Sequence, residues 1–244
     1  MTDLFESDSK VPKDELSQTN TPLAEKLRPK SLNEVVGQDR ILAADGQLTL
    51  MVKSSQLVSI IFWGPPGVGK TTIARAIANE VSAHYEEISA IFSGVSDLKK
   101  LLNAASVRYS NGARTILFVD EIHRFNKSQQ DSFLPYMENG SIILMGATTE
   151  NPSFELNSAL LSRSQVLILE RLNAEDLLKI FNRAIGSMKN APMFSENAIS
   201  FIIEMSDGDG RSLLNYIEQV ASWNSNNTVT EQDLKTRLSR RVTN

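Results

Sequence analysis

Residues 64–71, with the sequence GPPGVGKT, constrain the fold more than any other segment of this chain. They match the phosphate-loop pattern G-x-x-x-x-G-K-[ST] at every fixed position. The glycines allow the backbone to curl, so that successive N–H groups can point at phosphate oxygens. The loop follows the apolar run 60–63 and precedes a helix-favouring segment at 72–80. A strand, this loop and a helix in succession predict an α/β fold that binds a nucleoside triphosphate.

Each part of the loop has a defined task in the expected site. Lys70 supplies a mobile positive charge for the β- and γ-phosphates, and the Thr71 hydroxyl is expected to bind Mg²⁺. The helix that follows presents its positive amino-terminal end to the anion. The expected phosphate-binding residues are therefore Gly64, Pro65, Pro66, Gly67, Val68, Gly69, Lys70, Thr71 and Thr72.

The apolar run 116–119 ends in two acids, Asp120 and Glu121. In a parallel sheet the carboxyl end of this strand lies at the same edge as the phosphate loop. We expect Asp120 to hold Mg²⁺ through its water shell, and Glu121 to orient and activate the attacking water. The alternative is a pair of solvated acids that cap a helix, which the phosphate loop upstream disfavours. Two acids favour hydrolysis over binding alone.

A second strand-like run, 141–149, also ends in polar side chains. Either Thr148 or Thr149 could reach the γ-phosphate or the attacking water, and we favour Thr149. The alternative is that both threonines only close the strand.

Short apolar runs alternate with helix-favouring segments between residues 58 and 169, which predicts right-handed crossovers and a three-layer sheet with five parallel strands. The expected strands are 58–63, 85–88, 115–119, 141–146 and 166–169, and the expected helices are 71–81, 95–109, 127–138 and 158–161.

Beyond Leu169 the strand pattern stops and only helices are expected. Asn173 can cap a helix to about residue 187, and Ser195 can cap another to about residue 205. A third helix is expected over 211–223, and Thr230 begins a capping box for a last helix through residue 241. We therefore expect a polar, disordered tail at 1–21, a nucleotide-binding αβα domain at 22–170 and a small all-α lid domain at 171–244.

The composition excludes several other classes of protein. The chain has no cysteine and two histidines, which excludes disulfide scaffolds, thiolate metal sites and histidine-rich metal centres. No apolar run approaches the ~20 residues of a membrane span, and the first 20 residues do not resemble a signal peptide. We expect a cytoplasmic protein with no membrane partner. The net charge of −4 gives no global argument for nucleic-acid binding, so contact with DNA would need a local patch.

Longer sequence strings point to one family. FVDEIHRFNKSQQD at 118–131 and GATTENPSFELNSALLSR at 146–163 are far more specific than the phosphate loop. Together with LRP at 27–29, VVGQ at 35–38 and GDGR at 208–211, they resemble an AAA+ ATPase of the clamp-loader clade. Within that clade they are similar to the family of replication-associated recombination protein A, whose eukaryotic relative is the Werner helicase-interacting ATPase.

The resemblance implies roles that the spacing of residues does not establish. Arg28, Pro29, Val36 and Gly37 would line the adenine pocket of bound ATP, and Thr149 would be the first sensor. Arg163 would be an arginine finger that acts on the nucleotide of a neighbouring subunit, and Arg211 would be the second sensor of its own subunit. A finger that acts in trans implies self-association.

The sequence departs from the family in two respects. The second-sensor segment has Gly210 and Ser212 where the family usually has alanine and arginine. A glycine inside a helix costs up to ~1 kcal/mol, which predicts a more flexible lid. Family members also continue beyond the lid into a further helical domain that drives assembly, and we expect this chain, which ends at Asn244, to lack it.

The resemblance implies an ATPase that acts on forked, gapped or single-stranded DNA at stalled replication forks or recombination intermediates, near the nucleoid, with single-strand-binding protein as a possible partner. The tripeptide Asp3-Leu4-Phe5 faintly resembles peptides that bind the sliding clamp, against the alternative of a plain tail. Two other functions stay open. One is a nucleotide-dependent adaptor of a clamp-loader-like assembly that barely hydrolyses ATP, and the other is a Holliday-junction branch-migration motor.

Overall fold

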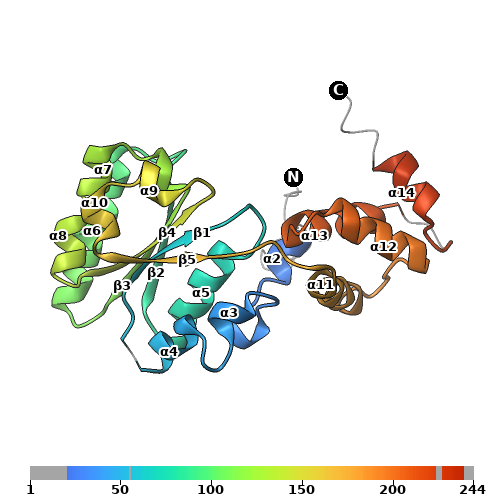
Figure 1. Ribbon diagram of the computed structural model, residues 1–244, viewed down its shortest axis with the longest axis horizontal. Coiled ribbons are helices and arrows are strands. Elements are labelled where there is room, and N and C mark those ends of the chain that lie inside the picture. The colour runs from blue at the N-terminus through green and yellow to red at the C-terminus, as the bar shows by residue number, and fades with distance from the viewer. Residues whose placement is uncertain (1–20, 55, 224–226, 239–244) are drawn as a thin grey trace, which may run out of the picture.

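The computed structural model describes residues 21–54, 56–223 and 227–238. Figure 1 shows a sheet with helices on both faces and, beside it, a group of helices from the last part of the chain. The strands are β1 Ser59–Trp63, β2 His84–Ser89, β3 Thr115–Asp120, β4 Ile142–Thr148 and β5 Ser164–Ile168. The helices are α2 Leu23–Lys26, η1 Leu32–Glu34, α3 Asp39–Leu42, α4 Gln47–Lys53, α5 Lys70–Glu80, α6 Val95–Ser110, η2 Ile122–Arg124, α7 Lys127–Asp131, α8 Leu134–Glu138, α9 Pro152–Glu155, α10 Ser158–Leu161, α11 Ala174–Ser187, α12 Glu196–Met205, α13 Gly210–Ala221 and α14 Glu231–Arg237.

The five strands form one parallel sheet in the order β2-β3-β4-β1-β5, which confirms the expected fold class. Central strand β1 pairs with β4 on one side and β5 on the other. The phosphate loop follows β1, Asp120 ends β3 and Glu121 follows it, so the loop and both acids lie at the carboxyl edge of the sheet. Strand β4 lies between β1 and β3, so the loop and the acids are one strand apart at the carboxyl edge, where ligands bind in such sheets.

The central strands β1, β3 and β4 are buried on both faces, and successive side chains of each strand point to opposite sides of the sheet. Ile60 and Phe62 of β1 join the hydrophobic cluster under α5, whereas Ile61 joins the cluster under α6. The same alternation holds in β3, where Phe118 faces α5 and Val119 faces α6. These clusters hold the carboxyl edge of the sheet in place.

One expected helix is wrong. The segment 127–138 forms two short helices, α7 and α8, separated by turn residues 132 and 133. Pro135 lies in the first turn of α8, and proline has no N–H to donate to the carbonyl four residues earlier. Gln130, at the end of α7, donates to the backbone oxygens of Phe125 and Glu155. The break therefore allows α7 to pack against the segment that follows β4.

Helices α11–α14, here called the helical lid, share a hydrophobic cluster with α2, whose Leu23 is one of the buried members. Asn173, Ser195 and Thr230 cap α11, α12 and α14 as expected. Gly210 is the first residue of α13 and not an interior one, because Asp209 is the N-cap and accepts from the Ser212 N–H at 2.9 Å. The predicted loss of helix stability at Gly210 therefore has no basis in the structure.

Two sequence predictions lie outside the described residues. These are residues 1–20 of the expected tail, with its Asp-Leu-Phe tripeptide, and residues 239–241 of the expected last helix. Helix α14 itself ends at Arg237 with Leu238 as its C-cap, which is earlier than expected. Within the described part of the chain, no helix combines the length and the hydrophobicity that a bilayer span requires.

Candidate functional site

The phosphate loop connects the end of β1 to the start of α5. Gly67 and Gly69 have φ values of 70° and 103°, in the left-handed region that favours glycine. A Cβ added at Gly69 would have no heavy atom within 4 Å, so the space beside this residue is open. The loop thus forms an open concave backbone at the amino-terminal end of an 11-residue helix, which is where an anion binds.

Lys70 is buried, with 8% of its surface exposed, and its ammonium group turns back onto the loop. Nζ donates to the backbone oxygens of Gly64 at 2.7 Å and Pro65 at 2.8 Å. Burial lowers the pKa of Lys70, while the negative charges of Glu121 and Asp120 act in the opposite direction. Lys70 therefore places a positive charge beside the loop at the wall of the pocket. Its ammonium group could exchange the two carbonyl oxygens for the phosphate oxygens of a ligand.

Asp120 is the last residue of β3, and Glu121 follows it in a left-handed backbone conformation with φ 52° and ψ 44°. A left-handed backbone is uncommon for residues other than glycine and clusters at functional sites. The turn directs the chain away from the strand at once, into η2. Both acids line the same pocket as Lys70.

This pocket lies between the phosphate loop, the segments on both sides of η1 and the helical lid. Among the residues expected from the sequence, it brings together Arg28, Pro29, Val36, Pro66, Gly67, Val68, Gly69, Lys70, Thr71, Thr72, Asp120, Glu121 and Arg211. Gly37, Gly64, Pro65, Thr149 and Arg163 do not line it. Gly64 and Pro65 still act on the site, since their carbonyls hold Lys70.

Gly37 supports the pocket from outside. Its φ is +74°, and a Cβ there would lie 2.7 Å from Cδ2 of Leu172 and 2.9 Å from Oδ2 of Asp176. Glycine at this position therefore permits close packing of the segment before α3 against the start of the lid. Leu172 itself lines the pocket.

The two threonines at the end of β4 differ in environment. Thr148 is fully buried, and its Oγ1 lies 2.9 Å from Nδ1 of His123. Thr149 is exposed and borders the open carboxyl edge of the sheet. The exposed position is the one that a ligand could reach, whereas Thr148 takes part in an internal contact.

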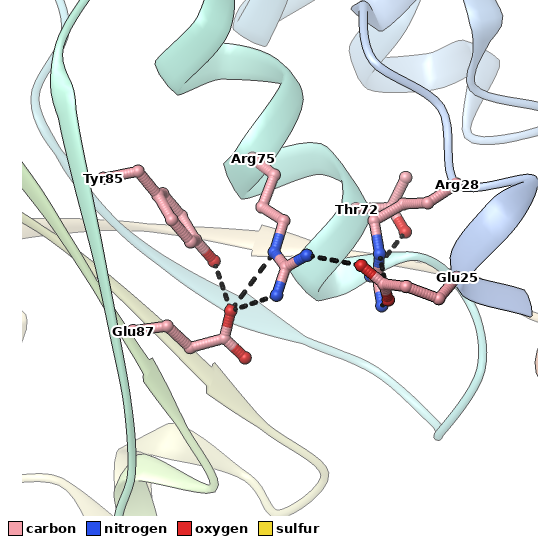
Figure 2. Close-up of polar contacts among 6 residues, drawn as sticks. All are labelled: Glu25, Arg28, Thr72, Arg75, Tyr85 and Glu87. Carbon is pink, nitrogen blue, oxygen red and sulfur yellow. Dashed lines mark hydrogen bonds and ion pairs between the residues drawn. The ribbon is translucent and has the colours of Figure 1, made fainter. Parts of the chain in front are cut away.

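Arg28 is held at the pocket by a chain of polar contacts (Figure 2). Its guanidinium pairs with Glu25 at 2.5 Å and lies 3.4 Å from Oγ1 of Thr72. Arg75 of α5 joins Glu25, at 2.8 Å, to Glu87 of β2, at 2.9 Å. The hydrogen bond from Arg28 lowers the pKa of Glu25. These contacts tie α2 to α5, so the wall of the pocket that contains Arg28 is positioned relative to the phosphate loop.

The helical lid contacts the phosphate loop directly. The N–H of Gly210 donates to the backbone oxygen of Gly67 at 3.2 Å, and a Cβ on Gly67 would lie 1.7 Å from Oδ1 of Asp209. Arg211 follows at the start of α13, lines the pocket, and its charge contributes to the lowered pKa of Lys70. A movement of the lid would therefore move a cation relative to the phosphate loop.

Sequence reasoning missed Arg183 and most of the apolar wall. Arg183 lies on α11, lines the pocket and donates from Nη1 to the backbone oxygen of Glu34 at 2.9 Å. The sequence around Arg183 shows only an amphipathic helix, so no local signal marks this residue. The apolar lining residues that were not expected are Ala24, Leu27, Val35, Leu172, Ile180 and Leu214.

Arg163 lies at the opposite edge of the sheet. It precedes Ser164, which pairs with Ser59 at the start of β1, whereas the phosphate loop follows the end of β1. A five-residue strand spans about 16 Å. The guanidinium pairs with Glu138 at 2.7 Å. Arg163 therefore cannot complete the pocket of its own chain without a large rearrangement.

The residues of the pocket fit a magnesium–nucleotide complex. The open cradle at Gly69 and the buried Lys70 suit phosphate, and the neighbouring Thr71 hydroxyl and Asp120 carboxylate offer the oxygen ligands that Mg²⁺ prefers. The apolar wall suits the flat face of a base. The fold and the loop are those of a nucleotide-binding domain.

Comparison with known proteins gives the same result. The family model "ATPase family associated with various cellular activities (AAA)" matches residues 60–172. The chain is 46% identical to replication-associated recombination protein A of Escherichia coli K12 over 208 residues, which is 83% of this chain and 46% of that protein. It is 42% identical over 221 residues to ATPase WRNIP1 of Dictyostelium discoideum, covering 89% of this chain and 25% of that protein.

The chain spans about half the length of the bacterial relatives that it matches. Among solved structures, it is similar to a mutant of RuvB from Thermotoga maritima, with a TM-score of 0.73 and 26% identity over 88% of this chain and 73% of that one. A structure described as the RuvB Holliday junction branch migration motor of the same organism gives a TM-score of 0.67 and 29% identity, covering 87% of this chain and 67% of that one.

Proposed function

Because this chain belongs to the AAA ATPases and, within them, to the family of replication-associated recombination protein A, we propose that it binds and hydrolyses ATP and acts on DNA at stalled replication forks or recombination intermediates. The observation that supports this most is the shared pocket of Lys70, Asp120, Glu121 and Arg211. These residues come from three distant segments of the sequence, and their charges suit a triphosphate and its metal ion.

Each of these residues has a chemical task in the proposed reaction. The loop N–H groups and Lys70 bind the phosphates, and Thr71 and Asp120 hold Mg²⁺, which neutralises charge on the phosphate oxygens when bound. Glu121 orients a water molecule and accepts its proton as the water oxygen attacks the γ-phosphorus and the bond to the bridging oxygen breaks. Thr149 and Arg211 sense the γ-phosphate from the sheet and from the lid.

We propose that the site is complete only between two copies of the chain. Arg163 is at the edge of the sheet opposite the pocket, about 16 Å along β1, and it is 41% exposed. From there it can face the pocket of a neighbour. An arginine that arrives in trans is worth about 10³–10⁵ in rate in related phosphoryl transfers. Self-association is then part of the catalytic cycle.

The proposed DNA substrate rests on the relatives, one of which is named for replication-associated recombination. Forked, gapped and single-stranded DNA are the forms to test, and single-strand-binding protein and the sliding clamp are the proteins to test as partners. A place near the nucleoid would follow from action on DNA. A weakly hydrolysing adaptor and a branch-migration motor are less favoured, because identity to the recombination proteins is 46% and to the RuvB structures 26–29%.

The test is steady-state ATP hydrolysis as a function of protein concentration, with and without forked or single-stranded DNA. We expect activity that rises faster than in proportion to protein concentration and that increases with DNA. Lys70→Ala should remove nucleotide binding, and Glu121→Gln should retain binding and lose turnover. Turnover that is undiminished in Glu121→Gln, or ATP affinity that is unchanged in Lys70→Ala, would contradict the proposal.

A further inference from the structure

His123 is a buried polar residue to which the proposed reaction assigns no role. It lies in η2, directly after the two acids, and 3% of its side chain is exposed. Nδ1 lies 2.9 Å from Oγ1 of Thr148. Nε2 lies 3.3 Å from Oε2 of Glu121 and 3.4 Å from Oε1 of Glu150, and it has no hydrogen bond of good geometry to either carboxylate. The imidazole thus lies between the last buried residue of β4 and Glu121.

The contacts of His123 favour a proton on Nε2. Two carboxylates face Nε2, and a carboxylate accepts hydrogen bonds, so Nε2 must be an N–H donor. The Thr148 hydroxyl has two acceptors within reach, Nδ1 of His123 at 2.9 Å and the backbone oxygen of Glu150 at 3.2 Å, and its own oxygen accepts the Glu150 N–H at 3.0 Å. Nδ1 is the nearer acceptor, so the hydroxyl can donate to it. With the proton on Nε2, Nδ1 can accept from Thr148 and the N–H points towards the two carboxylates, whereas a proton on Nδ1 alone would leave a lone pair facing them.

The backbone around His123 is held rigidly. Gly146 of β4 has no side chain, and a Cβ there would lie 2.9 Å from Cδ1 of Ile122. The fully buried Ile122 therefore packs directly on β4 and seats η2 against the sheet. Glu121, one residue earlier, has the left-handed backbone described above and lines the pocket. The backbone of Glu121 is therefore fixed, and its carboxylate can move only by rotation about the side-chain bonds. Nε2 of His123 is the buried nitrogen next to that carboxylate.

We propose that His123 is a positioning residue for Glu121: its Nε2–H directs the Glu121 carboxylate towards the pocket, and its Nδ1 fastens this arrangement to Thr148 at the end of β4. The inference rests on the proposed function, because it assigns a task to a residue that acts through Glu121. Through these two contacts His123 connects Thr148, the neighbour of the proposed sensor Thr149, with Glu121, the residue proposed to activate water. Glu150, the second carboxylate at Nε2, competes with Glu121 for the same donor.

Two substitutions separate the two nitrogens of His123. In His123→Gln the amide nitrogen can occupy the position of Nε2, so donation to Glu121 is retained. In His123→Asn the shorter amide reaches Thr148 but not Glu121. We expect His123→Asn to lower kcat by roughly 10- to 100-fold, because misplacement by about 1 Å costs ~10² in rate, with KM and nucleotide affinity unchanged. His123→Gln should retain most of the turnover, and His84→Asn, at an exposed histidine, is the matched control.

A spectroscopic measurement gives a result that does not depend on turnover. The chain has two histidines, so long-range ¹H–¹⁵N spectra of the wild type and of His84→Gln assign the His123 ring without ambiguity. We expect the Nε2–H form in the nucleotide-free protein. Glu121→Gln should shift the Nε2 resonance of His123, whereas Glu138→Gln, at the far edge of the sheet, should not.

The outcomes distinguish this inference from the proposed function. If the wild type shows no Lys70-dependent hydrolysis, both fail. If it does, and His123→Asn matches the wild type, or His123→Gln loses as much as His123→Asn, the inference fails alone. An Nδ1–H form, or a loss of kcat accompanied by an equal loss of nucleotide affinity, also overturns the positioning role.

Discussion

The two edges of the sheet differ in how many of the proposed catalytic and binding residues they hold. The carboxyl edge gathers a buried cation, two acids and a lid arginine in one pocket. The amino edge holds one candidate for catalysis, Arg163, in an ion pair with Glu138. Under the proposed function, one copy of the chain binds a nucleotide with its own residues and needs a second copy for rapid turnover. Binding and turnover should therefore respond differently to substitutions at the two edges.

The largest expected effect comes from removing the proposed finger. Arg163→Ala should lower ATP hydrolysis by about 10³-fold or more at protein concentrations where the wild type self-associates, because the transition-state charge loses its partner in trans. Nucleotide affinity, measured with a fluorescent analogue, should stay within a few-fold of the wild type.

Mixing two variants, one altered at each edge of the sheet, tests whether the finger acts on the pocket of another copy. Glu121→Gln has an intact finger and no base, and Arg163→Ala has an intact pocket and no finger. Each should be inactive alone, and an equal mixture should recover a substantial part of the wild-type rate. A mixture that stays inactive while both variants bind nucleotide would contradict a finger that acts in trans.

The next effect concerns the pocket. ATP at 100 times its Kd stabilises a folded protein by about 2.7 kcal/mol, which for a chain of this size raises Tm by roughly 5–10 °C. Lys70→Met should show almost no rise in Tm, since the phosphates lose their buried cation. Thermal denaturation with and without nucleotide measures this, and Lys53→Met, at an exposed lysine of α4, should behave as the wild type does. A full rise in Lys70→Met would mean that nucleotide binds elsewhere.

A smaller effect is expected at the lid. Arg211→Ala should weaken nucleotide affinity roughly 10- to 100-fold, because a hydrogen bond to a charged group contributes about 1.5–3 kcal/mol. Arg211→Lys should retain part of the affinity through its charge. Isothermal titration with a non-hydrolysable analogue distinguishes the two, and equal affinity in all three proteins would remove Arg211 from the pocket in solution.

The smallest effect lies at the amino edge. Arg163 and Glu138 are both substantially exposed, so their ion pair is worth ~0.2–1 kcal/mol. Glu138→Gln should raise hydrolysis at low protein concentration by up to about fivefold, because the finger no longer has to leave a partner. Glu231→Gln, which breaks another exposed ion pair in α14, is the matched control and should leave the rate unchanged.

Much of the fold followed from the sequence because its signals are local. The five strands were expected within one or two residues of their observed bounds, since buried parallel strands are short apolar runs. The break between α7 and α8 was missed, although Pro135 is visible in the sequence. The remaining short helices before the phosphate loop and after β4 have too few residues for a periodic pattern.

The residues of the candidate site also fall into those that the sequence predicted and those that it did not. Lys70, Asp120 and Glu121 were named because a glycine-rich loop and a strand that ends in acids are contiguous patterns. Arg183 was not, because only the packing of α11 brings it to the pocket. The contact of His123 with Thr148 and Glu121 likewise joins residues from two strands, and no spacing in the sequence announces it.

The sequence by itself determined that the chain has a phosphate loop on a parallel α/β sheet. The curvature of the loop and the strand that ends in acids each depend on residues that are adjacent in the sequence. Only the tertiary structure decided that the lid contacts this loop at Gly67 and that Arg163 lies at the other edge. The physical reason is that strand order and helix packing arise from contacts between residues far apart in the chain, which local side-chain patterns constrain only weakly.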